Sequence, residues 1–157
     1  RRASSQCTAM IDLNAKLDEA IKIARYAVSL HDVQVIKQYT PKALVMGNPE
    51  ELLHVFINLI INAVQAMESG GILTVSSTRQ PNALHVRVSD TGCGMPQKQL
   101  EQIFEPFFTT KPPGKGTGLG LYNTKHVITK MHGSISVESQ PGMGSTFTIS
   151  FPPAQTD

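Results

Sequence analysis

Apolar residues recur every three or four positions in three stretches of the chain, and this spacing predicts three helices. The first is expected to begin with Asn14 as its capping residue and to run to about residue 30. The second should begin near Pro49, because proline is favoured in a first helical turn, and end near residue 67 before two glycines. The third covers about residues 119–131, and a shorter helix is predicted near 96–103.

Alternating apolar and polar residues predict the strands. They cover residues 33–39, 43–47, 72–79 and 83–90, with a closing hairpin within 134–152. Helices and strands are mixed without strict alternation, so we predict an α+β fold rather than a doubly wound parallel one. We expect a two-layer α/β sandwich with the helices on one face of a mixed sheet.

Length and charge restrict the class of protein. The 157 residues suffice for one domain, which we place at residues 12–153, between an N-terminal remnant or linker (1–11) and a tail (154–157). A net charge of +2 without basic runs argues against a nucleic-acid partner, and two widely separated cysteines favour the cytoplasm. No apolar run reaches the roughly 20 residues of a membrane span. The sequence does not begin with methionine, so we expect a piece of a longer protein that could carry a membrane anchor.

The helix predicted from Pro49 carries two asparagines, Asn58 and Asn62, one turn apart and therefore on one face. Asparagine is a poor helix former, and its amide needs a hydrogen-bond partner where it is buried. Two interpretations remain open on this helix alone. The amides bond to neighbouring backbone, or they present a neutral oxygen to a hard cation such as Mg²⁺.

Asp90 ends a predicted buried strand and begins the stretch "DTGCGM". Gly92 and Gly94 would let the backbone turn and approach a flat ring closely, while the carboxylate accepts a hydrogen bond from an exocyclic amine. A simple turn from strand to loop has the same pattern. Cys93 has no His or Cys partner at metal-ligand spacing, so we reject a metal site here.

Residues 104–117 are rich in proline and phenylalanine and lack a helix or strand pattern, so we expect a lid over a binding site. Lys111 could reach a phosphate from this loop, although a solvated lysine is an equally good interpretation. Gly116, Gly118 and Gly120 then run into the last helix, where free amides and the helix dipole favour phosphate. Their spacing matches neither the dinucleotide fingerprint nor the phosphate loop of P-loop NTPases.

Taken in order, these motifs resemble the catalytic ATP-binding domain of bacterial sensor histidine kinases, in the GHKL superfamily with its Bergerat-type fold. The resemblance runs from about residue 12 to residue 152. It includes "NLIINAVQAM", "DTGCGM", "FEPFFTTK", "GTGLGL", "HGSISVES" and "GMGSTFTISFP". It implies ATP and Mg²⁺ as cofactors.

The resemblance also implies roles for particular residues. Asn62 would bind the Mg²⁺ ion, with Asn58 supporting it, and Asp90 would recognise the adenine amino group above Gly92 and Gly94. Ser145 occupies the position of a threonine that often helps to hold adenine. The phosphates would be wrapped by the backbone of Gly116, Thr117, Gly118, Leu119 and Gly120, and contacted by Lys111.

Two departures from the family pattern affect these roles. Many members carry a basic and then an aromatic residue where this chain has Gln65 and Ala66, so a phosphate contact and an adenine stack from that helix are in doubt. Asn58 stands where ATP-hydrolysing relatives carry a glutamate that activates water. This favours transfer of the γ-phosphoryl group to a histidine, as in two-component signalling. A GHKL ATPase, a nucleotide-binding module without catalysis and a protein-serine kinase remain alternatives.

None of the histidines has the context of a phosphoacceptor. His31 is followed by an acid, but it lies at a predicted helix end and lacks the downstream proline or threonine of the usual box. We therefore expect the acceptor on a separate dimerisation domain of the longer protein, with a response regulator downstream. The piece itself should be a monomer and the longer protein a homodimer.

Overall fold

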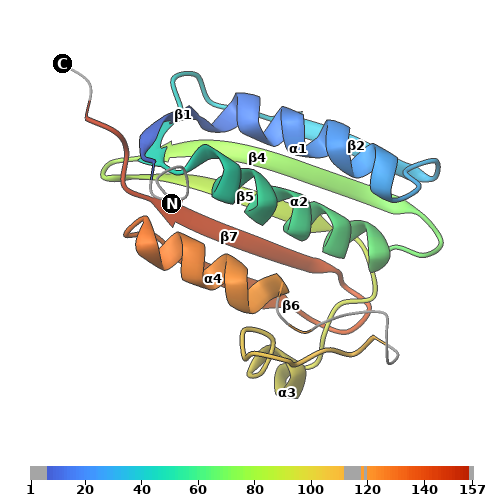
Figure 1. The fold of residues 1–157 in the computed structure, drawn as a ribbon. Helices are drawn as coiled ribbons and strands as arrows, with labels where there is room; N and C mark the ends of the chain where they lie inside the picture. The colour runs from blue at the N-terminus through green and yellow to red at the C-terminus, as the bar shows by residue number, and fades with distance from the viewer. Residues whose placement is uncertain (1–6, 112–117, 119, 156–157) are drawn as a thin grey trace.

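The computed structural model describes residues 7–111, 118 and 120–155. Its elements form two layers, in which three helices cover one face of a five-stranded sheet (Figure 1). This confirms the predicted α+β sandwich. No helix in these described residues combines the length and apolar character that a bilayer crossing requires.

The main sheet is mixed, as predicted. It consists of β2 (Val33–Gln38), β4 (Gly71–Gln80), β5 (Ala83–Asp90), β7 (Ser145–Phe151) and β6 (Ser134–Ser139), in that spatial order. The β2 and β4 strands are parallel, and every other neighbouring pair is antiparallel. The β5–β7 register places Asp90 directly opposite Ser145, so two residues far apart in sequence meet at one end of the sheet.

A second, two-stranded sheet was not fully predicted. It pairs β1 (Ala9–Asp12) with β3 (Leu44–Gly47) in antiparallel register. The amide of Ala154 adds a hydrogen bond to the Leu44 carbonyl at 2.8 Å. Residues 9–11 and Ala154, which the sequence analysis placed in the N-terminal segment and the tail, therefore hydrogen-bond to β3. Strand β1 has four residues and buries only Ile11, too little for an alternating pattern to reveal it.

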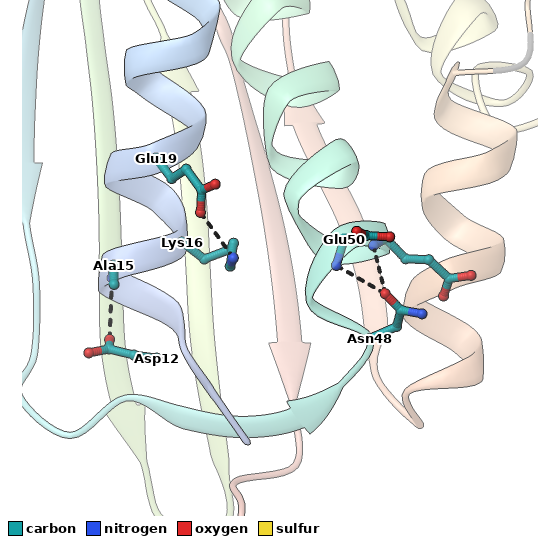
Figure 2. Close-up of polar contacts among 7 residues, drawn as sticks. Asp12, Ala15, Lys16, Glu19, Asn48 and Glu50 are labelled. Atoms are coloured by element: carbon teal, nitrogen blue, oxygen red, sulfur yellow. Dashed lines mark hydrogen bonds and ion pairs between the residues drawn. The ribbon is translucent and has the colours of Figure 1, made fainter. Parts of the chain in front are cut away.

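The α1 helix (Leu13–Ala27) is capped by Asp12, not by Asn14, so that prediction was wrong. The Asp12 carboxylate accepts a hydrogen bond from the amide of Asn14 at 3.0 Å. It also accepts one from the amide of Ala15 at 3.3 Å (Figure 2). The Asn14 amide instead donates to the Thr40 carbonyl and accepts from the Ser77 hydroxyl, tying α1 to the sheet. The helix also ends three residues earlier than predicted, at Ala27.

The α2 helix (Pro49–Gln65) begins where the sequence predicts. Asn48 caps it by accepting hydrogen bonds from the amides of Glu50 and Glu51, at 3.0 and 3.1 Å (Figure 2). It lies between α1 and α4 (Gly120–Lys130) in the helical layer (Figure 1). The predicted short helix is reduced to α3 (Gln97–Leu100).

The core lies between the helical layer and the inner face of the sheet. The α2 helix contributes most to it because it is covered on both sides by other helices. Its fully buried side chains include Leu52, Phe56, Leu59 and Ile60, which belong to one cluster with Leu73 and Val75 of β4 and with Val86 and Val88 of β5. Burying an aliphatic or aromatic side chain contributes about 1.5–3 kcal/mol each, so this packing holds α2 rigidly against the sheet.

Candidate functional site

A cavity of about 840 Å³ opens along α2, between the ends of β5 and β7 and the start of α4. Its lining includes the following residues that the sequence singled out: Asn58, Asn62, Asp90, Gly94, Lys111, Gly118, Gly120 and Ser145. Gly92 is not among the lining residues. Three further predicted residues, Gly116, Thr117 and Leu119, lie outside the described residues. The fold thus gathers side chains from α2, two strands and two loops around one space.

Asp90 is the last residue of β5 and is buried, with 6% of its surface exposed. The amide of Gly92 donates to its Oδ1 at 2.8 Å. Burial raises the pKa of Asp90, and the backbone N–H groups of Gly92 and Ser145 act in the opposite direction. Asp90 also lines the cavity, so its carboxylate can accept a further hydrogen bond from an N–H group of a ligand. Such a bond would replace the water that the carboxylate loses on burial.

The glycines after Asp90 have different structural roles. Gly94 adopts a φ of +68°, and an added Cβ would overlap the carbonyl oxygen of Gln140 in the β6–β7 turn. A Cβ at Gly92 would overlap the carbonyl oxygen of Ala66, the residue that ends α2. The amide of Cys93 also donates to Ala66, at 3.1 Å. The "DTGCGM" loop is therefore held between α2 and the turn, with no space for side chains at either glycine.

Asn58 contacts α4 at another part of the cavity. Its Nδ2 donates to the Thr124 hydroxyl at 3.3 Å, and Thr124 is 2% exposed. A Cβ at Gly120 would lie 2.7 Å from the Asn58 Oδ1, so the glycine allows this close approach. The Asn58 amide thus donates to a side chain of α4, not to the neighbouring backbone that the alternative interpretation required.

Asn62 lines the cavity one turn after Asn58. Its amide has no hydrogen-bond partner among the described residues. An amide oxygen available in a cavity is suited to a cation that keeps most of its ligands as water or phosphate. In the described part of the chain, no three His, Cys, Asp or Glu side chains come together in a metal-binding group.

The cavity has two ends, set by their positions along α2. The Asp90 end comprises Asp90, Gly94 and Ser145. It is joined to the end of α2 by the hydrogen bond from the Cys93 amide to the Ala66 carbonyl. The Asn58 end comprises Asn58, Gly118 and Gly120, and begins two helical turns earlier, about 12 Å along the helix axis. Among the described lining residues the carboxylates are those of Asp90 and Glu68, and Glu68 also follows Ala66. Both carboxylates therefore belong to the Asp90 end.

Lys111 also lines the cavity, from the stretch that was predicted to be a lid. Phe104 at its start packs edge-on against Phe147, with ring centroids 6.4 Å apart. Phe107 adopts a φ of +68° and donates its amide to the Gly118 carbonyl at 2.8 Å. This hydrogen bond joins the stretch that carries Lys111 to Gly118, which precedes α4. Residues 112–117 of the predicted lid lie outside the described residues.

Sequence reasoning missed several participants. Val28 and Ser29, which follow α1, line the cavity although nothing in their local sequence indicates it. Thr124 was not identified as the partner of Asn58. A signal for it existed, because Thr124 lies one turn after Gly120 on the same helical face.

Comparison with known families gives one match that covers most of the chain. Residues 47–155 match the family model described as histidine kinase-, DNA gyrase B- and HSP90-like ATPase. Two curated relatives are Sporulation kinase A of Bacillus subtilis, 38% identical over 143 residues, and sensor histidine kinase ZraS of Escherichia coli, 32% identical over 145 residues. Each alignment covers 90% of this chain but only 23% and 30% of the relatives, so the chain spans less than a third of their length.

Solved structures give the same result for the fold. The mycobacterial sensor histidine kinase MprB superposes with a TM-score of 0.83 at 26% identity, covering 96% of this chain and 100% of the other. The catalytic domain of histidine kinase ThkA also gives 0.83 at 26% identity, covering 95% and 99%. These two structures correspond to this chain over nearly their whole length.

Proposed function

Because the chain belongs to the histidine kinase-, DNA gyrase B- and HSP90-like ATPase family, as an ATP-binding catalytic domain of the sensor histidine kinase type, we propose that it transfers the γ-phosphoryl group of ATP to a histidine. The histidine would lie on a separate phosphoacceptor and dimerisation domain of a longer protein. A response regulator would then receive the phosphoryl group in two-component signalling.

The observation that carries this proposal is the side chain at position 58. An amide cannot take a proton from water at neutral pH, and Thr124 holds this amide against α4. The described lining has no carboxylate at the Asn58 end that could replace it as a base. Among the described lining residues, water therefore has no carboxylate base at the Asn58 end, and we expect the nucleophile to come from another domain.

Transfer would then depend on positioning and on electrostatic stabilisation, which suffice for most phosphoryl transfer. A nitrogen lone pair of the incoming imidazole forms the bond to the γ-phosphorus. The bond from that phosphorus to the β–γ bridging oxygen breaks, and ADP leaves with its electron pair. Lys111 and the backbone amides of residues 116–120, the glycine-rich stretch that leads into α4 in the sequence, are our candidates for contacts to the phosphates.

Asp90 would hold the adenine amino group at the opposite end. Its carboxylate is buried and partly satisfied by Gly92, so an N–H donor from the base completes its hydrogen bonding. Gly94 leaves room for the ring, and Ser145 borders it on the β7 side. Since positions 65 and 66 are glutamine and alanine, the end of α2 offers neither a basic side chain for a phosphate nor an aromatic ring to stack on adenine.

A Mg²⁺ ion fits the donor set of this cavity. Asn62 would hold it through its amide oxygen, with phosphate and water as the other ligands, which Mg²⁺ commonly retains. A full protein cage is unnecessary for a cation that arrives with a nucleotide. When bound, the ion supplies positive charge that neutralises the phosphates.

The test is a transfer assay with γ-labelled ATP, Mg²⁺ and the separately produced phosphoacceptor domain of the same longer protein. We expect acid-labile, base-stable label on that domain, lost in Asn62→Ala and retained in Asn123→Ala, a matched change at an exposed asparagine of α4. Steady phosphate release without the acceptor would overturn the proposal in favour of an ATPase. Binding without either reaction would indicate a regulatory module, and acid-stable label a protein-serine kinase.

A further inference from the structure

Three polar contacts meet at the hydroxyl of Ser139, which lies just behind the cavity wall. The amide of Met95 donates to its Oγ at 2.8 Å. The Ser139 hydroxyl donates to the Gly144 carbonyl at 2.9 Å. Its Oγ also lies 2.7 Å from the Oγ of Ser145, which lines the cavity.

The direction of the Ser139–Ser145 hydrogen bond follows from counting hydrogens. A hydroxyl has one hydrogen and two lone pairs, an amide can only donate, and a carbonyl can only accept. The Ser139 hydrogen goes to Gly144, and Met95 uses one lone pair, so Ser145 must donate to the other. Ser145 is 7% exposed, so water does not readily reorient it. Only lone pairs of Ser145 remain for the cavity.

Asp90 is the register partner of Ser145, so both groups border the same part of the cavity. A carboxylate alone does not separate the two purines, because guanine also has donors in N1–H and its 2-amino group. Guanine, however, carries an acceptor, O6, where adenine carries its 6-amino donor. Beside a Ser145 that can only accept, that O6 has no partner.

We propose that Ser139 is a positioning residue that fixes the Ser145 hydroxyl as an acceptor and thereby makes the site select ATP over GTP. The inference rests on the proposed function, in which the base lies at the Asp90 end. Removing the Ser139 hydroxyl releases the hydrogen of Ser145. Ser145 then donates to O6 of guanine while Asp90 accepts from N1–H, so GTP gains a partner that ATP does not need.

The experiment is competition binding of ATP and GTP, each with Mg²⁺, to the chain and its variants. We expect the unmodified chain to prefer ATP. Ser139→Ala should narrow that preference roughly three- to ten-fold, as expected for one gained hydrogen bond. Ser139→Thr, which keeps the hydroxyl, and Ser136→Ala, at an exposed serine of the same strand, should preserve it.

A double variant separates hydroxyl direction from loop displacement. Adding Ser139→Ala to Ser145→Ala should change the GTP-to-ATP ratio no further, because the released hydrogen no longer exists. Three results would overturn the inference. The preference for ATP narrows further in the double variant, Ser139→Ala weakens the binding of both nucleotides equally, or the unmodified chain shows no preference for ATP. If Ser139→Ala shows no cooperative melting, Ser139→Cys decides, because a thiol fills the space but is a poor acceptor for the Ser145 hydrogen, so the ATP preference must narrow there too. Failure to bind any nucleotide would overturn the proposed function as well, whereas ATP binding with an unchanged ratio overturns this inference alone.

Discussion

Three glycines near the Asp90 end allow a graded test of how tightly this part of the site is built. At Gly142, an added Cβ would have nothing within 4 Å, but φ is +79°. At Gly92, φ is not positive, but the Cβ would overlap the Ala66 carbonyl oxygen. At Gly94, both conditions hold, with a φ of +68° and an overlap with Gln140. Substitution by alanine therefore separates backbone strain from steric overlap.

The expected losses in free energy of unfolding follow from these contacts. A left-handed backbone costs a residue with a Cβ about 1–2 kcal/mol, so Gly142→Ala should lose about 1 kcal/mol. Overlap with backbone atoms costs about 1–3 kcal/mol. At Gly92, the displaced carbonyl also accepts the hydrogen bond from Cys93, worth about 1 kcal/mol more. Gly92→Ala and Gly94→Ala should each lose about 3 kcal/mol.

The assay is equilibrium unfolding in urea followed by far-ultraviolet circular dichroism, because the chain has no tryptophan. In a thermal scan followed by the same signal, the melting temperature should fall by roughly 2–4 °C for Gly142→Ala and roughly 6–12 °C for the other two variants. ATP affinity should fall in Gly92→Ala and Gly94→Ala and persist in Gly142→Ala. The reasoning is refuted if Gly142→Ala unfolds as easily as the others, or if the others unfold like the unmodified chain.

Three further predictions concern single side chains. Asn48→Ala should lower the free energy of unfolding by about 1 kcal/mol, measured in urea, because α2 loses its N-cap; an unchanged midpoint would contradict the capping role. Burial raises the pKa of Asp90, so its carboxyl group holds a proton more tightly in the folded protein than in the unfolded chain. The folded protein therefore loses stability as the pH rises and this group ionises. From about pH 4 to pH 7, the difference in free energy of unfolding should therefore shift in favour of Asp90→Asn, whereas a shift the other way would refute the sign. Thr124→Val should slow phosphotransfer roughly three- to ten-fold by releasing the Asn58 amide, and Thr124→Ser should restore the rate; equal rates in both variants would count against the contact.

Sequence patterns predicted the larger elements well because their signals are long or redundant. Strands β4 and β5 alternate over most of their lengths, and α2 combines a capping residue, Pro49 and a long apolar face. The errors occur where a signal is short or ambiguous. Asp12 and Asn14 are both good capping residues two positions apart, and only the packing of α1 on the sheet decides between them. Strand β1 is too short for periodicity to identify.

The site was predictable to the extent that its residues lie in local motifs. Asn62, Asp90 and Gly94 could be identified because each stands in a short pattern with a physical reason for that residue type. Ser139 and Thr124 could not, since their roles depend on hydrogen bonds between elements that only the fold brings together. Val28 lines the cavity because of how α1 crosses α2, which periodicity does not determine.

The division of the cavity into two ends has a consequence for inhibitor chemistry. The Asp90 end is formed by the paired ends of β5 and β7 and by a loop that hydrogen-bonds to the end of α2, and its carboxylate lies two helical turns from Asn58. A small, uncharged heterocycle with one N–H donor for Asp90 would compete there with the whole nucleotide. It would need neither a triphosphate mimic nor a cation, two features that make competitors of ATP difficult to deliver into cells.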